Sequence, residues 1–164
     1  MTEILFKTDT YLFSYRVGGI LMRDDKILLQ KPLSDDGYAI PGGHVSFGET
    51  SESTLIREFK EEIDADIVVD RLVLVGENYF PWGDRVCQQI CLYYTVILCD
   101  STQIPLEGTF PVIDELLNEQ IDLEFTWMPL SQLNHIKLYP VNITEYLLSL
   151  PDQIKHFIYK ECNY

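Results

Sequence analysis

Three things are scarce in this chain of 164 residues: positive charge, cysteine and long apolar runs. The sequence has 12 lysine and arginine residues against 26 aspartate and glutamate residues, which gives a formal net charge of −14. A protein of that charge repels nucleic acid backbones and anionic membrane surfaces, so we expect neither long nucleic acid nor a membrane as a partner. A phosphate-bearing ligand would therefore need a cation as an intermediary.

Two further absences concern targeting and redox chemistry. No apolar stretch approaches the roughly 20 residues that a membrane helix needs, and the start MTEILFKTDTYLFSYRV lacks a basic segment followed by an apolar run. Cys87, Cys91, Cys99 and Cys162 have neither zinc-finger nor thioredoxin spacing, so we interpret them as reduced, buried thiols. These features predict a cytoplasmic protein.

What is present is typical of one globular domain spanning residues 1–164. Hydrophobic residues make up 46% and charged residues 23%, which excludes disordered and fibrous classes. No internal repeat or linker divides the chain. Its length is sufficient to bury a core without disulfides or structural metals.

The pattern of apolar residues predicts a mixed sheet packed against helices, which is an α/β fold. Thr50 is a plausible N-cap for a helix that follows it. The interval 101–120 fits either a long loop or a loop with a short helix at 112–119. The expected strands are 13–22, 26–31, 67–80, 86–98 and 121–130, and the expected helical segments are 50–63, 131–135 and a C-terminal segment at about 141–160.

The predicted helix at 50–63 carries an unusual concentration of negative charge in the stretch REFKEE. At about 100° per residue, Glu58, Glu61 and Glu62 span an arc of roughly 100° that is separate from the apolar face. Carboxylates three and four residues apart lie about 5–6 Å from each other and repel. Taken alone, this face is either a solvated helix surface or a site for a hard divalent cation such as Mg²⁺, which prefers carboxylate and water oxygens.

The surrounding sequence distinguishes these alternatives. The segment 43–65, GHVSFGETSESTLIREFKEEIDA, resembles the box of the Nudix hydrolase superfamily (MutT-like), G-x5-E-x7-R-E-U-x-E-E-x-G-U with U apolar. Asp64 departs from this pattern, because the family has glycine there; aspartate tolerates the left-handed backbone that the end of a helix requires. The matching residues are Gly43, Glu49, Arg57, Glu58, Phe59, Glu61, Glu62 and Ala65.

The resemblance implies an α/β/α sandwich with a mixed β-sheet and gives roles to the box residues. It implies that Glu58, Glu61 and Glu62, with the carbonyl of Gly42, hold Mg²⁺ or Mn²⁺. It also implies that Arg57 and Glu49 form a bracing ion pair, with Arg57 orienting the catalytic glutamates. The glycine at 43, like that at 42, lets the backbone approach the metal closely.

The resemblance leaves the general base open. Either Glu61 or Glu62 deprotonates the attacking water, or an acidic residue of a later loop does so. The later candidates are Glu107, Asp114, Glu115 and Glu119, and Glu124 ranks below them because it lies in a strand pattern.

The substrate pocket is the least determined part of the site. Stacking of a ring favours aromatic residues near loop ends, and His44 follows the glycines where a phosphate would lie. Pro81 and Tyr79 resemble markers of two different subfamilies, ADP-ribose pyrophosphatases and dinucleoside polyphosphate hydrolases, so neither selects a substrate. The aromatic candidates are Tyr38, Tyr79, Phe80, Trp82 and Trp127.

The resemblance implies a divalent-metal-dependent enzyme that hydrolyses the diphosphate linkage of a nucleoside diphosphate joined to another moiety. The substrate is then a nucleotide-sugar, an ADP-ribose-like molecule or a nucleoside triphosphate. The alternative is a Nudix-fold module that binds a nucleotide metabolite with little turnover. Many relatives are homodimers, so a homodimer is the expected assembly.

Overall fold

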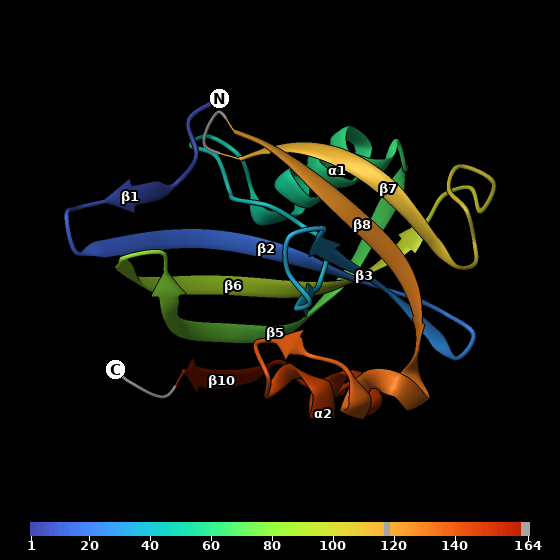
Figure 1. Ribbon diagram of the computed structural model, residues 1–164. Coiled ribbons are helices and arrows are strands. Elements are labelled where there is room, and N and C mark those ends of the chain that lie inside the picture. Colours follow the sequence, from blue (N-terminus) through green and yellow to red (C-terminus); the bar gives the residue numbers. More distant parts are fainter. Residues whose placement is uncertain (117–118, 162–164) are drawn as a thin grey trace.

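A computed structural model describes residues 1–116 and 119–161 (Figure 1). In these residues, ten strands form one mixed sheet. Its main path runs β10-β5-β6-β2-β3-β4-β9, with β1 paired to β2, and β8 paired to β3 and β7. The strands are β1 (Leu5–Lys7), β2 (Tyr11–Arg23), β3 (Lys26–Pro32), β4 (Tyr38–Ala39), β5 (Ile67–Trp82), β6 (Arg85–Leu98), β7 (Thr109–Leu116), β8 (Glu119–Pro129), β9 (Leu138–Tyr139) and β10 (Lys155–Lys160).

Helices cover both faces of this sheet. Helix α1 (Ser51–Ile63) lies on one side, and the 3₁₀ helix η1 (Leu130–His135) and α2 (Ile143–Leu148) lie on the other (Figure 1). The predicted α/β/α sandwich with a mixed sheet is therefore confirmed.

The alternation of side chains along β2 builds two cores, one on each face. Val17 and Leu21 pack with Phe59 of α1, whereas Ile20 points to the opposite face and packs with Leu147 of α2. Strand β2 therefore links the two layers. It also runs parallel to β6, while β5 and β6 form the long antiparallel pair that the sequence predicted.

The C-terminal prediction is wrong in part. Helix α2 covers only Ile143–Leu148, and residues 155–160 form β10, which pairs in parallel with the edge of β5. The burial of this segment has the two-residue period of a strand: Phe157 is 5% exposed and Ile158 is 54% exposed. Pairing with β5 satisfies backbone groups that a helix at this place would leave open at the sheet edge.

The interval 101–120 also differs from both expected alternatives. Its second part, Thr109–Leu116, is strand β7, which pairs antiparallel with β8. The apolar residues at 112, 113, 116 and 117 have the spacing of a helix face, so the sequence pattern favoured a helix, whereas pairing with β8 makes this segment a strand.

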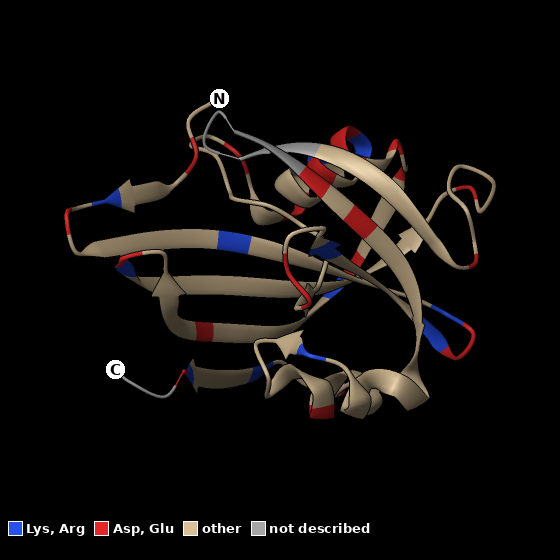
Figure 2. Cartoon of the chain, in the orientation of Figure 1, with Lys and Arg blue, Asp and Glu red and all other residues tan. Residues whose placement is uncertain are grey.

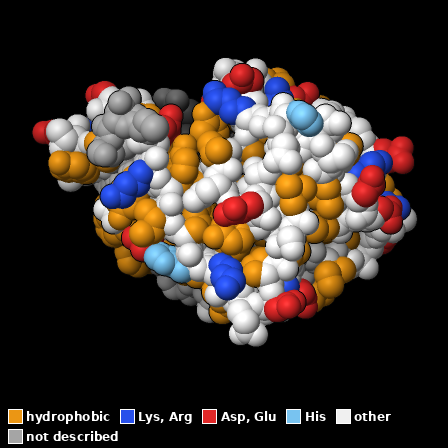
Figure 3. Space-filling model, turned by 90° about the horizontal axis from the view of Figure 1, so that it is seen from below, with side chains coloured by type: hydrophobic (Ala, Val, Ile, Leu, Met, Phe, Trp, Pro, Cys, Tyr) orange, Lys and Arg blue, Asp and Glu red, His pale blue; other side chains and the backbone are white. Residues whose placement is uncertain are grey.

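The surface agrees with the composition. Acidic residues are spread over loops, strands and α1, and basic residues are fewer (Figure 2). The face seen from below mixes both charges with apolar side chains (Figure 3). Exposed large apolar residues of the C-terminal part of the chain are Val141, Leu148, Ile154 and Ile158. No helix in the described part of the chain is both long and apolar enough to cross a bilayer.

Candidate active site

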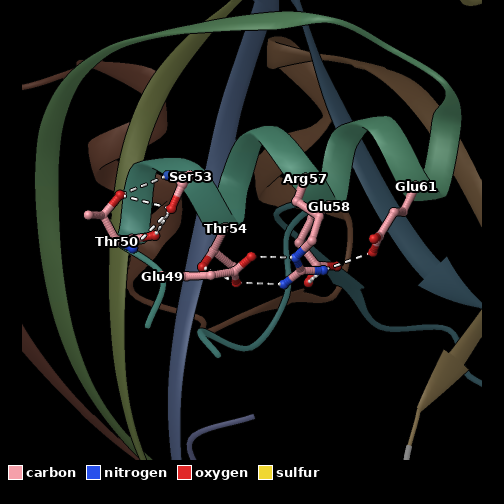
Figure 4. Close-up of polar contacts among 7 residues, drawn as sticks. All are labelled: Glu49, Thr50, Ser53, Thr54, Arg57, Glu58 and Glu61. Atoms are coloured by element: carbon pink, nitrogen blue, oxygen red, sulfur yellow. Dashed lines mark hydrogen bonds and ion pairs between the residues drawn. The ribbon is translucent and has the colours of Figure 1, made fainter. Parts of the chain in front are cut away.

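Helix α1 begins and ends at well-defined caps. The Thr50 hydroxyl accepts a hydrogen bond from the Ser53 backbone N–H at 3.1 Å, and the Ser53 hydroxyl accepts one from the Thr50 N–H at 2.9 Å (Figure 4). This reciprocal capping box fixes the first turn. The helix ends at Asp64, whose φ of 51° is left-handed, so aspartate adopts here the conformation expected of it. The box helix therefore keeps its boundaries without the usual glycine.

Arg57 is the centre of the polar network on α1 (Figure 4). Its Nε and Nη2 donate to the two carboxylate oxygens of Glu49 at 2.9 and 3.1 Å, and Thr54 Oγ1 donates to Glu49 at 2.9 Å. Its Nη1 lies 2.8 Å from a carboxylate oxygen of both Glu58 and Glu61. The predicted ion pair between the box loop and the helix is present, and Arg57 relieves part of the repulsion between the acidic side chains.

The ion pair between Glu49 and Arg57 shifts the pKa of both residues. The Arg57 guanidinium is the main reason that the pKa of Glu49 lies below its ordinary value. Hydrogen bonding to Glu49, followed by the charges around Glu58 and Glu61, raises the pKa of Arg57. At neutral pH both groups are therefore charged, and the brace is at full strength.

Two glycines let the backbone approach this network. Gly42 has a φ of 148°, and a Cβ there would lie 2.2 Å from the carbonyl oxygen of Val17. A Cβ at Gly43 would overlap the carboxylate of Glu58, which is 12% exposed. Any side chain at either position would displace β2 or Glu58, so the local structure requires glycine at both.

The carboxylate oxygens of α1 and the carbonyl oxygen of Gly42 are of the chemical type that binds a hard divalent cation. Carboxylate and carbonyl oxygens are the ligands that Mg²⁺ and Mn²⁺ accept. Among the residues whose side chains the structure describes, however, no three Asp, Glu, His or Cys residues are grouped closely enough to form a ready metal site. Arg57 lies between Glu58 and Glu61, and the Gly42 carbonyl accepts a hydrogen bond from Arg16 Nη2 at 2.7 Å. A cation would therefore replace guanidinium contacts at these oxygens.

A cavity of about 400 Å³ lies beside this region, on the α2 face of the sheet. Arg16 lines the cavity and donates to Gly42, and Gly43 touches the carboxylate of Glu58. The cavity and the acidic face of α1 thus adjoin the same short loop from opposite sides. The other lining residues are Asp35, Ala39, Ile40, Asn78, Phe80, Pro81, Trp82, Gln89, Cys91, Tyr93, Tyr139, Pro140, Tyr159 and Glu161.

The structure brings two of the predicted ring-binding residues into this cavity. Phe80 and Trp82 both line it, with ring centroids 6.2 Å apart. Tyr79 is adjacent to Phe80 in sequence, so its side chain points to the opposite face of β5, where its hydroxyl donates to Glu77 at 3.3 Å. Trp127 is buried in the α1-side core, and its Nε1 donates to the Pro105 carbonyl at 2.8 Å.

His44 is not part of the cavity wall. It is 4% exposed, with Nδ1 3.8 Å from a carboxylate oxygen of Glu3. Burial, helped by the charge of Arg16, lowers the pKa of His44 to about 4. The imidazole is therefore neutral at pH 7, which is poor chemistry for binding a phosphate by charge.

Two of the alternative general bases, Glu107 and Glu124, lie next to lysine residues. Glu107 is exposed, and its carboxylate lies 3.9 Å from Lys26 Nζ; Glu124 is 3.3 Å from Lys31 Nζ. The side chains of Asp114, Glu115 and Glu119 lie outside what the structure describes. Of the earlier candidates, Glu61 is half-exposed on α1, and Glu62 follows it on the same helix.

The sequence interpretation missed most of the cavity. Arg16, Asn78 and Gln89 are polar residues on the inward side of strands, and Tyr139 and Tyr159 come from the C-terminal part of the chain. A signal did exist for Gln89, because it shares parity with the buried Cys87 and Cys91 on β6. A polar residue on a buried strand face is a candidate for binding.

Comparison with known proteins agrees with this geometry. The family model described as NUDIX domain matches residues 13–147. An ADP-ribose pyrophosphatase of Methanocaldococcus jannaschii is 47% identical over 49 residues, covering 28% of this chain and 29% of that protein. A MutT-like protein of Streptomyces ambofaciens is 36% identical over 72 residues, covering 43% and 47%. The matches span less than half the length of either relative.

A solved structure shows the same fold. The mutator MutT protein from Bacillus halodurans superposes with a TM-score of 0.57 at 15% identity, over 90% of each chain. At this identity the likeness concerns the arrangement of the sheet and helices alone.

Proposed function

The chain belongs to the NUDIX family, and from this premise we propose that it is a pyrophosphohydrolase that cleaves the diphosphate linkage of a nucleoside diphosphate derivative. The observation that carries the proposal is the shared loop at Gly42 and Gly43. On one side this loop touches Glu58 of the box helix, and on the other side it bonds Arg16 of the cavity. A substrate in the cavity would thus place its phosphates next to the box carboxylates.

The residues of the box have distinct tasks in this proposal. Arg57 orients Glu58 and Glu61 through its Nη1, and Glu49 fixes Arg57 in turn. Glu58, Glu61, Glu62 and the Gly42 carbonyl would hold Mg²⁺ or Mn²⁺. When bound, such an ion neutralises charge on non-bridging phosphate oxygens and makes water more acidic.

Proton transfer from the attacking water falls to a carboxylate of α1 in this account. The Glu61 side chain is 58% exposed and thus accessible to water, while Glu58 is 12% exposed. We assign the general base to Glu61, with Glu62 as the other candidate. Arg16 binds a phosphate oxygen, since a guanidinium has five N–H donors and one is already fixed on Gly42.

The partner is a small nucleotide derivative, since an acidic chain disfavours long nucleic acid. We also propose that the protein forms a homodimer and is located in the cytoplasm. The UDP-sugar, ADP-ribose and nucleoside triphosphate classes all share the diphosphate that the proposed site needs.

The test is a panel of nucleoside diphosphate derivatives assayed with Mg²⁺, with Mn²⁺ and with EDTA. It includes ADP-ribose, sugar nucleotides, dinucleoside polyphosphates and nucleoside triphosphates, and the products are identified by chromatography. We expect metal-dependent cleavage of one substrate class into two products that each carry phosphate. Binding of a panel member without cleavage, in protein that binds Mn²⁺, would instead favour the sensing module.

A further inference from the structure

The cavity carries charges of opposite sign at different places. Among its lining residues, all of which lie in the described part of the chain, Arg16 is the one base, and Asp35 and Glu161 are the two acids. Arg16 Nη2 donates to the Gly42 carbonyl at 2.7 Å, so its charge lies beside the glycine loop. The cavity as a whole is therefore acidic, and its positive charge is confined to the side where the phosphates of the proposed substrate would bind.

Glu161 lies at the other end of the cavity floor. Its backbone N–H donates to the Tyr79 carbonyl at 3.0 Å, which continues the pairing of β10 with β5 by one residue and places Glu161 beside Phe80. In the sheet register, Phe80 lies two strands across and four residues along from Arg16. With strands about 4.8 Å apart and a rise of about 3.4 Å per residue, the Cα atoms of Arg16 and Phe80 are about 17 Å apart. The positive and negative sides of the cavity are thus well separated.

Aromatic rings line the cavity next to Glu161. Phe80 and Trp82 have ring centroids 6.2 Å apart, with their planes inclined by 38°. Tyr159 also lines the cavity and precedes Glu161 by two residues, so both side chains point to the same face of the sheet. All three aromatic side chains are half-buried, which leaves part of each ring available to a ligand. Phe80, Trp82, Tyr159 and Glu161 together form what we call the acidic end of the cavity.

The nearby basic residues of β10 have their contacts on the opposite face of the sheet. Lys160 Nζ is 5.2 Å from the centroid of the Tyr79 ring, and His156 Nε2 is 2.8 Å from a carboxylate oxygen of Glu77. Because side chains alternate along a strand, both contacts lie away from the cavity. The charge of Lys160 is therefore directed away from the carboxylate of Glu161.

Aromatic faces beside a carboxylate favour an organic cation. The face of an aromatic ring is negative, and it attracts a desolvated cation more strongly than an exposed one. Glu161 adds a full opposite charge at the same place. A neutral ring would gain only stacking there, and an additional phosphate would be repelled by Glu161 and by Asp35.

We infer that the acidic end of the cavity binds a cationic group of the substrate, such as a pyridinium ring or an N-methylated purine base. The aromatic rings contact the flat cation, and Glu161 supplies the opposite charge. The diphosphate at the other end of the substrate then reaches Arg16, so the charges of ligand and cavity are complementary at both ends. This inference rests on the proposed function, because it names one end of that substrate.

The test compares ligands of nearly the same shape that differ by one charge. The first pair is nicotinamide mononucleotide, whose pyridinium ring is cationic, and its reduced form, whose ring is neutral. The second pair is 1-methyladenosine monophosphate, which is cationic at the base at neutral pH, and AMP, whose base is neutral. Binding is measured by calorimetry in EDTA, so the readout is independent of metal and of hydrolysis. A salt concentration of about 0.15 M screens the carboxylates far from the cavity.

We expect the cationic member of each pair to bind about tenfold more tightly, because it gains both the contact with the rings and the attraction of the carboxylate. Equal binding, tighter binding of the neutral members, or no saturable binding of any of these ligands would overturn the inference.

Two variants that each remove one carboxylate locate the site. Glu161→Gln keeps the size of the side chain and should reduce the preference for the cation by about threefold or more. Glu77→Gln is the matched control, since it removes the same charge from the same pair of strands on the opposite face. Trp82→Leu should also reduce the preference, because it removes one ring. A preference that is unchanged in folded Glu161→Gln protein, or that falls equally in Glu77→Gln protein, contradicts the assignment.

The outcomes for the two proposals are distinguishable. A preference for the cationic ligands without any cleavage in the nucleotide panel keeps the inference about the cavity and removes the enzyme. Cleavage in the panel without a preference for the cationic ligands keeps the enzyme and removes the role of the acidic end.

Discussion

Arg57 closes a bidentate ion pair on Glu49, with Nε and Nη2 at 2.9 and 3.1 Å from its two carboxylate oxygens. The pair ties the loop before α1 to the middle of the helix. Because the remaining nitrogen, Nη1, also reaches Glu58 and Glu61, one side chain both stabilises the loop and orients the acidic face. A planar, forked donor is needed for this arrangement.

We therefore predict that Arg57→Lys lowers both stability and activity. Lysine cannot form the paired bonds, and the side chain is only 19% exposed, so we expect a loss of about 1–3 kcal/mol in the free energy of unfolding. Urea denaturation measures it. Lys60→Met is the control on the same helix, since Lys60 pairs with Asp64 at the exposed surface, where ion pairs contribute little. Equal stability of the two variants would show that Arg57 does not brace the loop.

Gly42→Ala should be far more harmful than an equivalent change elsewhere in the loop. It combines a positive φ with a clash against the Val17 carbonyl, and we expect a loss of about 3 kcal/mol or more. Gly48→Ala is matched, because Gly48 also has a positive φ but a Cβ added there would meet no other atom within 4 Å. It should cost only about 1–2 kcal/mol. Similar melting temperatures for the two variants would contradict the close approach of Gly42 to β2.

His44 should make stability depend on pH in a defined window. Its pKa falls to about 4 in the folded chain, against an ordinary value near 6.5. Between these values the unfolded chain binds the extra proton, so the free energy of unfolding decreases as pH falls from about 6.5 to 4. His44→Gln should flatten this slope in urea titrations at a series of pH values. A slope that is the same in both proteins would assign it to other groups.

The cysteines should differ sharply in reactivity. Burial raises the pKa of Cys87 to about 12 and that of Cys91 to about 11, and the thiolate is the reactive form. Cys99 is exposed just beyond β6, which corrects its interpretation as a buried thiol. In a Cys162→Ser background, one thiol should react quickly with maleimide, and Cys99→Ser should abolish that reaction. If Cys99→Ser protein still reacted quickly with maleimide, the burial of Cys87 and Cys91 would be contradicted.

The sequence was sufficient to predict the elements whose structure depends on residues close together in the chain. Thr50 and the apolar face of α1 predicted the helix because caps and periodicity act within a few positions. The turn expected at 81–84 is present but shorter, at Gly83 and Asp84, because β5 continues to Trp82. The ion pair between Glu49 and Arg57 was also expected, because the resemblance to the Nudix box implied it. These features depend little on what lies across the molecule.

Contacts between distant segments were not predictable in the same way. β10 is extended because the edge of β5, some 80 residues earlier, accepts it, and no local signal outweighed the helical spacing of its apolar residues. The cavity combines Arg16, Asn78 and Tyr139 from three different parts of the chain. Only the sheet register places them on one face, and a single sequence does not specify that register.

The most direct measurement of the central claim is the turnover of Glu61→Gln on the substrate that the nucleotide panel identifies, with Mg²⁺ saturating. Glu52→Gln is the control, because Glu52 is exposed in the first turn of α1, about 180° around the helix from Glu61. The account predicts at least about a hundredfold loss of kcat for Glu61→Gln with an unchanged fold by circular dichroism, and near-normal turnover for Glu52→Gln. Near-normal turnover of Glu61→Gln would contradict the assignment of the acidic face of α1 as the catalytic site.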